Sequence, residues 1–176
     1  AKIDARAPYE WVSRGGVKLA AALAAFAIDP QGLACLDIGA STGGFAHVLV
    51  SRGAKSVVCV DVGHGQLHPS IASDPRVKNM ERTDARKLTA ADLDAAPGLI
   101  VVDVSFISLE RVLPHVLALA APQAKLVALI KPQFEAGPEH VKKGVVRDEK
   151  IHAAVCAKIE KLVAGLGWRR IGLVAS

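Results

Sequence analysis

A glycine-rich turn between two apolar segments is the first feature of this sequence that could do chemistry. It reads DIGASTGGF at positions 37–45, where a strand would run into a helix. Small residues at 39, 41 and 43 let a ligand approach the backbone. Asp37 can accept a hydrogen bond from a cationic amino group, directly or through water, whereas it would repel a pyrophosphate. The turn therefore predicts a ligand that carries a cationic group.

Two further carboxylates follow later apolar segments. Asp61 ends the second segment, roughly 20 residues farther on, where a carboxylate can bind both ribose hydroxyls of an adenosine. Asp84 follows the third segment and could accept from an adenine amino group. Nicotinamide enzymes share the ribose-binding carboxylate, so these residues indicate an adenosine ligand without choosing its class.

The elements that must position these residues alternate between strand-like and helix-like patterns. The strands are expected at 33–38, 56–61, 77–81, 99–104, 125–130 and 170–174. The helices are expected at 17–26, 44–52, 66–72, 108–120 and 149–165, with Ser13 as a cap for the first and Gly15-Gly16 as a possible loop. This alternation predicts an α/β domain of Rossmann-like fold, with a mostly parallel sheet and helices on both faces.

Composition narrows the class of protein. The chain has 176 residues, 51% of them hydrophobic, which suits a single packed domain. Its apolar runs fall well short of the roughly 20 residues that a membrane helix needs. Because residues 1–6 also lack the pattern of a secretory signal, we expect a cytoplasmic chain with no membrane partner. A formal charge of +5 is compatible with a polyanionic partner, while 4% aromatic residues argues against a binder that stacks successive bases.

Five motifs in order carry a resemblance to a known family. They are SRGGVKL at 13–19, DIGASTGGF at 37–45, VDVG at 60–63, VDVSFISL at 102–109 and IKPQFE at 130–135. Together they resemble the TlyA family, whose members are similar to FtsJ-type ribose 2′-O-methyltransferases and are often labelled haemolysins. The resemblance implies an FtsJ-like sheet, S-adenosylmethionine as the methyl donor, and methylation of cytidine riboses in ribosomal RNA.

The resemblance also implies a Lys-Asp-Lys-Glu catalytic set, of which Lys18, Asp103 and Lys131 match positions here. The family's glutamate lies in a C-terminal Gly-Asn-Val-Glu-like stretch that is outside this sequence, as is the family's N-terminal RNA-binding domain. We therefore expect residues 1–176 to be a C-terminally truncated methyltransferase domain without its last strand. The expected cofactor-binding residues are Asp37, Gly39, Ala40, Ser41, Thr42, Gly43, Gly44, Asp61, Val62, Asp84 and Asp103.

The three matching residues also make chemical sense by their positions. Asp103 ends the fourth expected strand and Lys131 follows the fifth, so both should project at the carboxyl edge of the sheet. A ribose hydroxyl must lose its proton as it attacks a methyl sulfonium. A lysine accepts that proton only if its pKa falls, which a second cation such as Lys18 favours and Asp103 opposes while orienting the amine.

Basic residues near the expected substrate entrance suggest contacts with RNA. Lys142, Lys143 and Arg147 fall in a long loop at 131–148, and together with Arg14 they are predicted to contact RNA phosphate. A solvated loop is the competing interpretation. His64 and His68 are four residues apart, but no third ligand is evident and Pro69 interrupts the helix, so no metal site is predicted.

Three other functions remain open at this point. The haemolysin label suggests a membrane-damaging cytolysin, although the sequence offers no export signal or membrane-spanning segment to support it. A nicotinamide-binding oxidoreductase would use the same glycine-rich turn but lacks an obvious hydride-transfer site. A domain that binds cofactor or RNA without turnover is the third alternative.

Overall fold

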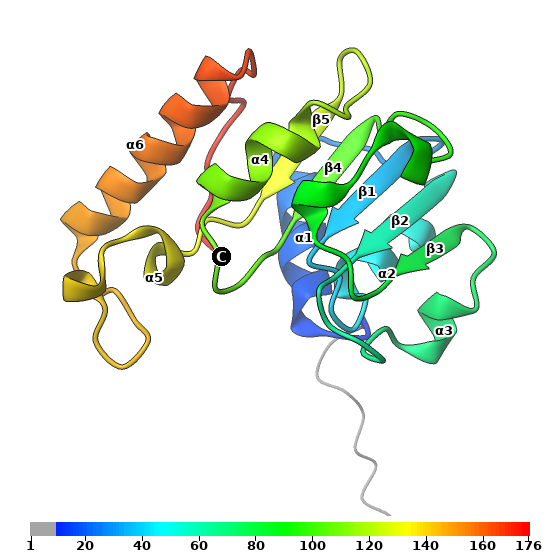
Figure 1. The fold of residues 1–176 in the computed structure, drawn as a ribbon, viewed down its shortest axis with the longest axis horizontal. Coiled ribbons are helices and arrows are strands. Elements are labelled where there is room, and N and C mark those ends of the chain that lie inside the picture. The colour runs from blue at the N-terminus through cyan, green and yellow to red at the C-terminus, as the bar shows by residue number, and fades with distance from the viewer. Residues whose placement is uncertain (1–9) are drawn as a thin grey trace, which may run out of the picture.

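Five parallel strands form one sheet at the centre of the molecule (Figure 1). The computed structural model describes residues 10–176. The strands are β1 (Ala34–Ile38), β2 (Ser56–Val60), β3 (Val77–Met80), β4 (Leu99–Val102) and β5 (Lys125–Ala128). Their order is β3-β2-β1-β4-β5, and each neighbouring pair is parallel. The direction of winding reverses beside β1, which is where open α/β sheets bind their ligands.

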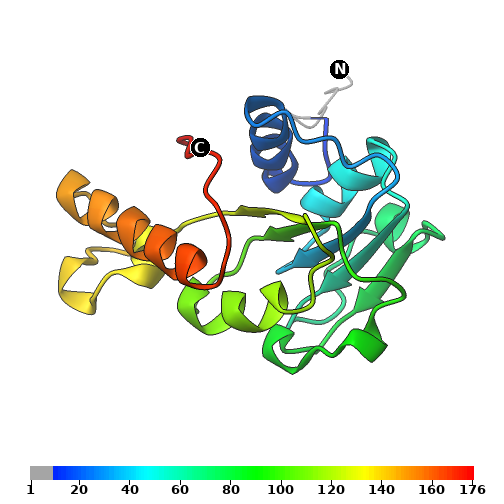
Figure 2. The same cartoon turned by 90° about the horizontal axis from the view of Figure 1, so that it is seen from above.

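Helices cover both faces of this sheet (Figure 2). On one face lie α1 (Arg14–Ala25) and α2 (Gly44–Ser51), and on the other α4 (Leu109–Leu117), with α6 (Glu149–Gly165) packed beside it. Two single-turn helices, α3 (Pro69–Ala72) and α5 (Pro132–Glu135), follow β2 and β5, and short 3₁₀ turns occupy 85–87, 90–92 and 138–140. The predicted α/β fold with a parallel sheet and helices on both faces is confirmed.

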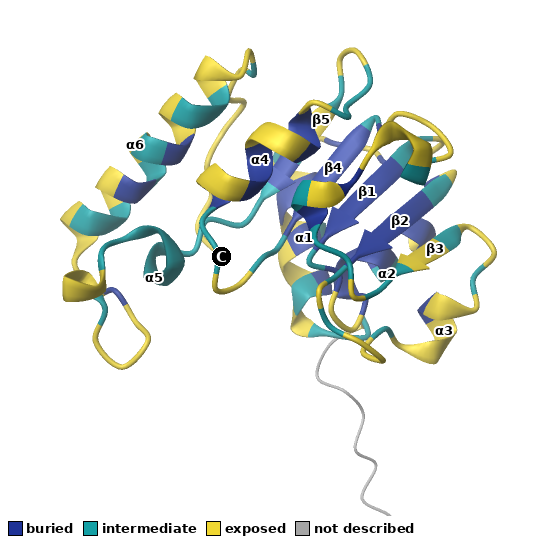
Figure 3. Ribbon diagram, viewed as in Figure 1, coloured by how far each residue is buried: buried dark blue, intermediate teal, exposed yellow. Residues whose placement is uncertain are grey.

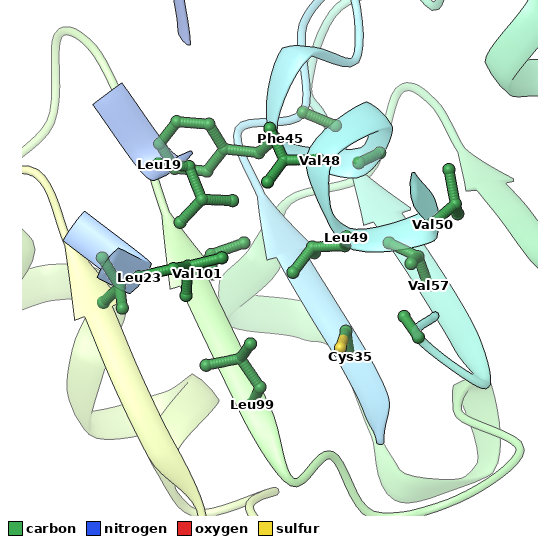
Figure 4. Close-up of a cluster of buried hydrophobic side chains, with 14 of the residues drawn as sticks. Leu19, Leu23, Cys35, Phe45, Val48, Leu49, Val50, Val57, Leu99 and Val101 are labelled. Carbon is green, nitrogen blue, oxygen red and sulfur yellow. The ribbon is translucent and has the colours of Figure 1, made fainter. Parts of the chain in front are cut away.

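Two apolar cores lie on opposite faces of the sheet, because side chains alternate along each strand. On β1, Cys35 belongs to the core beneath α1 and α2, whereas Leu36 belongs to the core beneath α4. Figure 4 shows the first core, in which Leu19, Leu49 and Val101 come from two helices and the sheet. All four residues of β4 are buried (Figure 3), which explains its uninterrupted apolar sequence. Each fully buried side chain of this size stabilises the fold by about 1.5–3 kcal/mol.

The first helix begins earlier than predicted. It starts at Arg14 and continues through Gly15 and Gly16, which the sequence had left open as a loop. A side chain at position 16 would collide with Trp11, so glycine lets the preceding segment fold back on the helix. Ser13 occupies the predicted N-cap position, although its side chain makes no capping hydrogen bond. The start of α1 is thereby placed against α2.

Five of the six expected strands are present, and the sixth, at 170–174, is wrong. That segment follows α6 as irregular chain, and a cavity of about 170 Å³ lies between it and β5. Gly172 packs against Phe26 instead, so close that a side chain at 172 would clash with the Phe26 ring. An alternating apolar pattern makes a strand only where a partner supplies hydrogen bonds. The expected helix at 66–72 shortens to α3 for a local reason, since Pro69 fits best at a helix start.

Candidate functional site

The turn after β1 is shaped by residues in the left-handed backbone region. Gly39 has φ of 81° and Gly43 has φ of 100°, values that favour glycine, and Ser41 joins them at 51°. A side chain at position 39 would collide with the backbone carbonyl of Asp103. The turn therefore passes directly against the chain that leaves β4. Gly43 then stands at the N-cap position of α2.

A pocket of about 260 Å³ opens above this turn. Its walls come from the turn itself, from the beginnings of α1 and α2, and from the end of β4. The lining residues are Ser13, Arg14, Gly15, Gly39, Ala40, Ser41, Thr42, Gly44, Phe45 and Asp103. Most of the residues predicted to bind the cofactor thus gather around one hollow, together with the exposed Arg14.

Asp37 is fully buried below the turn. Within residues 10–176, neither of its carboxyl oxygens has a hydrogen-bond partner. The pKa of Asp37 is raised to about 8, chiefly by burial and to a lesser degree by the negative charges of Asp103 and Asp61, while the nearby backbone amide of Ala46 lowers it in part. A buried carboxyl group without a partner is costly to keep ionised. A cationic ligand group at the turn would lower that cost, so this orphaned carboxyl fits the predicted cofactor.

Asp61 fastens the turn to the end of β2. Its Oδ2 accepts from the Ser41 amide at 2.8 Å, and its Oδ1 accepts from the Gly63 amide at 2.7 Å. Each carboxylate oxygen has a second lone pair, so these bonds leave acceptor capacity for ribose hydroxyls. Val62, which follows it, is 76% exposed and offers an apolar surface at the same edge. Ribose binding by Asp61 stays a prediction.

Asp84 is engaged by a neighbouring arginine. Its carboxylate accepts from the Arg86 guanidinium at 2.7 Å and 3.0 Å and from the Arg86 amide at 2.9 Å. These bonds hold the pKa of Asp84 at about 2 and cap the 3₁₀ turn at 85–87. The adjacent Thr83 amide donates to the Asp61 carbonyl at 2.9 Å, which joins this turn to the residue that follows β2. Contact between Asp84 and an adenine stays a prediction.

Lys131 and Asp103 meet at the carboxyl edge of β4 and β5. The Lys131 Nζ lies 2.6 Å from Asp103 Oδ1 and donates to Ser105 Oγ at 3.0 Å. The first contact has the distance of an ion pair but not the angles of a hydrogen bond, so it is ionic. About a quarter of each side chain is exposed, 22% for the lysine and 26% for the aspartate. An amine is thus held, still accessible, beside the pocket that Asp103 lines.

Lys18 is not brought into this pair. It lies exposed on α1, one turn after the residues that line the pocket. Among residues 10–176, no hydrogen bond or ion pair joins Lys18 to Asp103 or Lys131. Its predicted catalytic role stays a prediction.

Sequence reasoning missed the residues that join the loops after β4 and β5. Phe106 is 91% exposed, has φ of 63° and packs on Phe134, with ring centroids 5.0 Å apart. Glu135 accepts from the Ser108 hydroxyl at 2.6 Å. All four residues belong to the two motifs that contain Asp103 and Lys131, and this proximity along the chain was the available signal. Which residue of one loop meets which residue of the other is not visible in a single sequence.

The basic loop lies beyond α5. The Lys142 and Val145 backbones pair across a tight turn at 2.9 Å and 3.0 Å, and Lys143 has φ of 50°. Lys142, Lys143 and Arg147 are all exposed. In Figure 1 this loop extends below α5, at the opposite end of the molecule from α3. Contact between these cations and RNA stays a prediction.

The two histidines have local partners. His64 Nδ1 lies 3.2 Å from Glu81 Oε2, and His68 Nδ1 accepts from the Ser70 amide at 3.1 Å, which caps α3. Within residues 10–176, no three potential metal-binding side chains gather at one place. None of the helices in the same range has the length and apolar character needed to cross a membrane.

The sheet order, the glycine-rich turn after β1 and the carboxylates at the strand ends define a Rossmann-like α/β domain of the methyltransferase class. Residues 11–176 match the FtsJ-like methyltransferase family along their whole length. The chain belongs to that family.

Similar proteins agree with this assignment. The chain is 49% identical over 167 residues to the 16S/23S rRNA (cytidine-2′-O)-methyltransferase TlyA of Mycobacterium tuberculosis, covering 94% of this chain and 62% of that protein. It is 37% identical to Hemolysin A of Brachyspira hyodysenteriae, covering 95% of this chain and 70% of that protein. A solved structure from Streptococcus thermophilus superposes with a TM-score of 0.91 at 40% identity, covering 94% of this chain and 61% of that chain. The predicted resemblance to the TlyA family is confirmed.

Proposed function

We propose that this chain is the methyltransferase domain of an enzyme that methylates the 2′-hydroxyl of cytidine in ribosomal RNA, with S-adenosylmethionine as donor. The observation that carries the proposal is the accessible Lys131 amine, held 2.6 Å from Asp103 at the rim of the pocket. Its relative in M. tuberculosis bears the name of that activity. Because this chain spans 62% of that relative, the activity of the whole protein is part of the proposal.

The residues in and around the pocket suit the cofactor by their chemistry. Asp37 would balance the cationic amino-acid group, and the glycine-rich turn would lie against that part of the molecule. Asp61 and the exposed Val62 would hold the ribose and the adenine side. S-adenosylmethionine, when bound, supplies an electrophilic methyl group. These residues explain why an adenosine compound with a positive charge fits better than a dinucleotide, in agreement with the family assignment.

On the acceptor side, Lys131 is the proposed group that receives or orients the proton of the ribose hydroxyl. Asp103 and Ser105 fix the direction of its amine, since both contact the same nitrogen. General-base assistance of this kind contributes roughly 10²–10⁴-fold to rate. The exposed Phe106 ring beside this site suits stacking on an unpaired base, which is how proteins commonly read single-stranded RNA.

Substrate binding would use the exposed cations. Arg14 at the pocket rim and Lys142, Lys143 and Arg147 in the loop beyond α5 are the proposed contacts to RNA phosphate. The partner is then ribosomal RNA or a ribosomal subunit, and the place of work is the cytoplasm. Family membership decides against the nicotinamide oxidoreductase, and the haemolysin name belongs to a relative.

The test is methyl transfer from labelled S-adenosylmethionine to ribosomal subunits by the full-length protein, followed by mapping of the modified nucleotide. We expect label at a cytidine ribose. An oligonucleotide of the mapped region that carries 2′-deoxycytidine at that position should accept no methyl group. Label on a base, or transfer to the deoxy substrate, would exclude ribose methylation. Leakage of liposomes by the pure protein would favour the membrane-damaging alternative instead.

A further inference from the structure

Two loops run side by side at the carboxyl edge of β4 and β5, at 103–109 and 131–135. Three residues of the second loop contact the first, and their contacts advance in step along both loops. Lys131 reaches Asp103 and Ser105, then Phe134 packs on Phe106 at a centroid distance of 5.0 Å. Glu135 finally reaches the residues at the start of α4. The lysine proposed to handle the proton is therefore one member of a continuous seam between the loops.

Glu135 makes the most buried contact of this seam. Its side chain is only 2% exposed. Oε2 accepts from the Ser108 hydroxyl at 2.6 Å, and Oε1 accepts from the Leu109 amide at 2.8 Å. Leu109 is the first residue of α4, whose N-terminal end favours negative charge. Both oxygens thus have strong partners at a helix start, which makes the carboxylate a firm anchor.

A lysine from α6 completes this anchor. The Lys158 Nζ donates to the Glu135 carbonyl at 3.3 Å and lies 3.8 Å from its Oε2. The same Nζ lies 3.2 Å from Glu110 Oε2 on α4. Glu135 is therefore fixed by groups from α4 and α6 as well as by its own loop.

We propose that Glu135 is a positioning residue that sets the Lys131 amine beside Asp103 and Ser105, an inference that rests on the proposed function. The two residues are the ends of a single helical turn, because Phe134 donates its amide to the Lys131 carbonyl at 2.9 Å and α5 spans only Pro132–Glu135. Anchoring Glu135 on α4 therefore fixes the location of Lys131 at the other end of this turn.

The chemistry of the contact separates two variants. In Glu135→Ala both acceptors disappear, and the Ser108 and Leu109 donors lose their partner. In Glu135→Gln the amide oxygen can accept from Leu109 while the amide nitrogen donates to Ser108, so the geometry survives without the charge. Glu139→Ala is the matched control, because that nearby side chain is 69% exposed and its ion pair is with the adjacent His140 rather than with α4 or α6.

The experiment combines single-turnover methyl transfer by the full-length protein with an NMR titration of the Lys131 amine, assigned by its absence in Lys131→Arg. We expect Glu135→Ala to lower the rate about 10- to 100-fold, with cofactor affinity within about twofold. Glu135→Gln should recover most of that loss, and Glu139→Ala should match the wild type. An amine that loses a carboxylate partner gives up its proton at lower pH, so the Lys131 midpoint should move down in Glu135→Ala only.

The two readouts separate this inference from the proposed function. A wild-type protein that methylates no ribosomal RNA would exclude the function, while the NMR midpoints, which need no substrate, would still test the positioning. An active wild type with an unchanged Lys131 midpoint in Glu135→Ala would overturn the positioning role. A loss of rate that only follows the folded fraction would overturn it as well. Should the alanine variant not fold, Lys158→Met provides the test: a smaller shift in the same direction supports the proposal, and no shift contradicts it.

Discussion

The two halves of the carboxyl edge are built in different ways. On the β1–β2 side, backbone conformation does most of the work, with Gly39 and Gly43 at positive φ and Asp61 bound to two backbone amides. On the β4–β5 side, side chains of two loops hold each other, through Lys131 with Asp103 and Glu135 with Ser108. The β1–β2 side is thus a cradle held by backbone conformation, and the β4–β5 side is a seat held by contacts between side chains. In the proposed function, the cradle holds the donor and the seat holds the acceptor. This difference predicts that substitutions in one half leave the other largely intact.

The largest effect is expected for Lys131. Lys131→Ala should lower single-turnover methyl transfer by roughly 10²–10⁴-fold, because it removes the proposed proton acceptor. Cofactor affinity should stay nearly unchanged, since the residue lies on the acceptor half. Lys131→Arg should fail in a similar way, because a guanidinium stays protonated at neutral pH. Transfer rates at saturating RNA across a pH series provide the measurement. A near-normal rate in the arginine variant would make Lys131 an electrostatic group rather than a base.

The buried carboxyl of the cradle predicts a dependence of stability on pH. The pKa of Asp37 is raised to about 8 in the folded protein, above the usual value of a carboxyl in the unfolded chain. The folded state then holds the proton more tightly, so this group lowers stability as pH rises from about 4 to 8. The free energy of unfolding of the wild type should therefore fall by about 2–3 kcal/mol between pH 5 and pH 7 because of this group, and Asp37→Asn should remove that fall. Urea unfolding of the wild type and the variant at both pH values measures these free energies. An equal change with pH in the two proteins would contradict the prediction.

Asp61 tests the cradle as a ligand site. Asp61→Ala removes a charged acceptor and releases the Ser41 and Gly63 amides, so S-adenosylmethionine binding should weaken. Loss of one such contact costs about 1.5–3 kcal/mol, or roughly ten- to a hundredfold in affinity. Calorimetric titration gives the dissociation constant, with NAD as the comparison ligand. A change within twofold would refute the ribose site, and equal binding of NAD would refute the donor assignment.

The smallest effect is expected at the basic loop, outside both halves. Changing Lys142 and Lys143 together to Glu should weaken RNA binding several-fold and reduce the slope of log K against log salt by about 1–2. Cofactor affinity should not change, because these side chains lie on an exposed turn beyond α5. Binding of ribosomal RNA measured over a salt series gives both quantities. An identical slope of log K against log salt in the variant would show that the loop is a solvated surface without RNA contacts.

The sequence predicted the residues of the cradle on the β1–β2 side better than the contacts of the seat on the β4–β5 side. Local signals were enough to place Asp37, Gly39 and Asp61, because glycine spacing and strand ends are properties of neighbouring residues. Asp103 and Lys131 were also placed at the right edge, since parallel strands align their carboxyl ends. The sequence did not predict that backbone amides bind the Asp61 oxygens or that Arg86 binds Asp84, and the structure was needed to show both.

What escaped prediction depends on contacts between distant segments. The seam from Asp103 to Glu135 pairs residues 26 to 28 positions apart, and nothing in one sequence gives that register. The expected strand at 170–174 failed for the same reason, because its partner could not be identified from its own alternating pattern. Lys18 matched a family motif, yet its side chain lies exposed on a helix rather than in the pair.

The contact between Gly39 and the Asp103 carbonyl joins donor cradle and acceptor seat through main chain alone. A distance between two side chains changes when either side chain is substituted, whereas a distance between two peptide units depends on the sheet that carries them. Glycine at position 39, with a hydrogen atom where alanine has a methyl group, therefore sets how closely the turn after β1 approaches the chain that leaves β4.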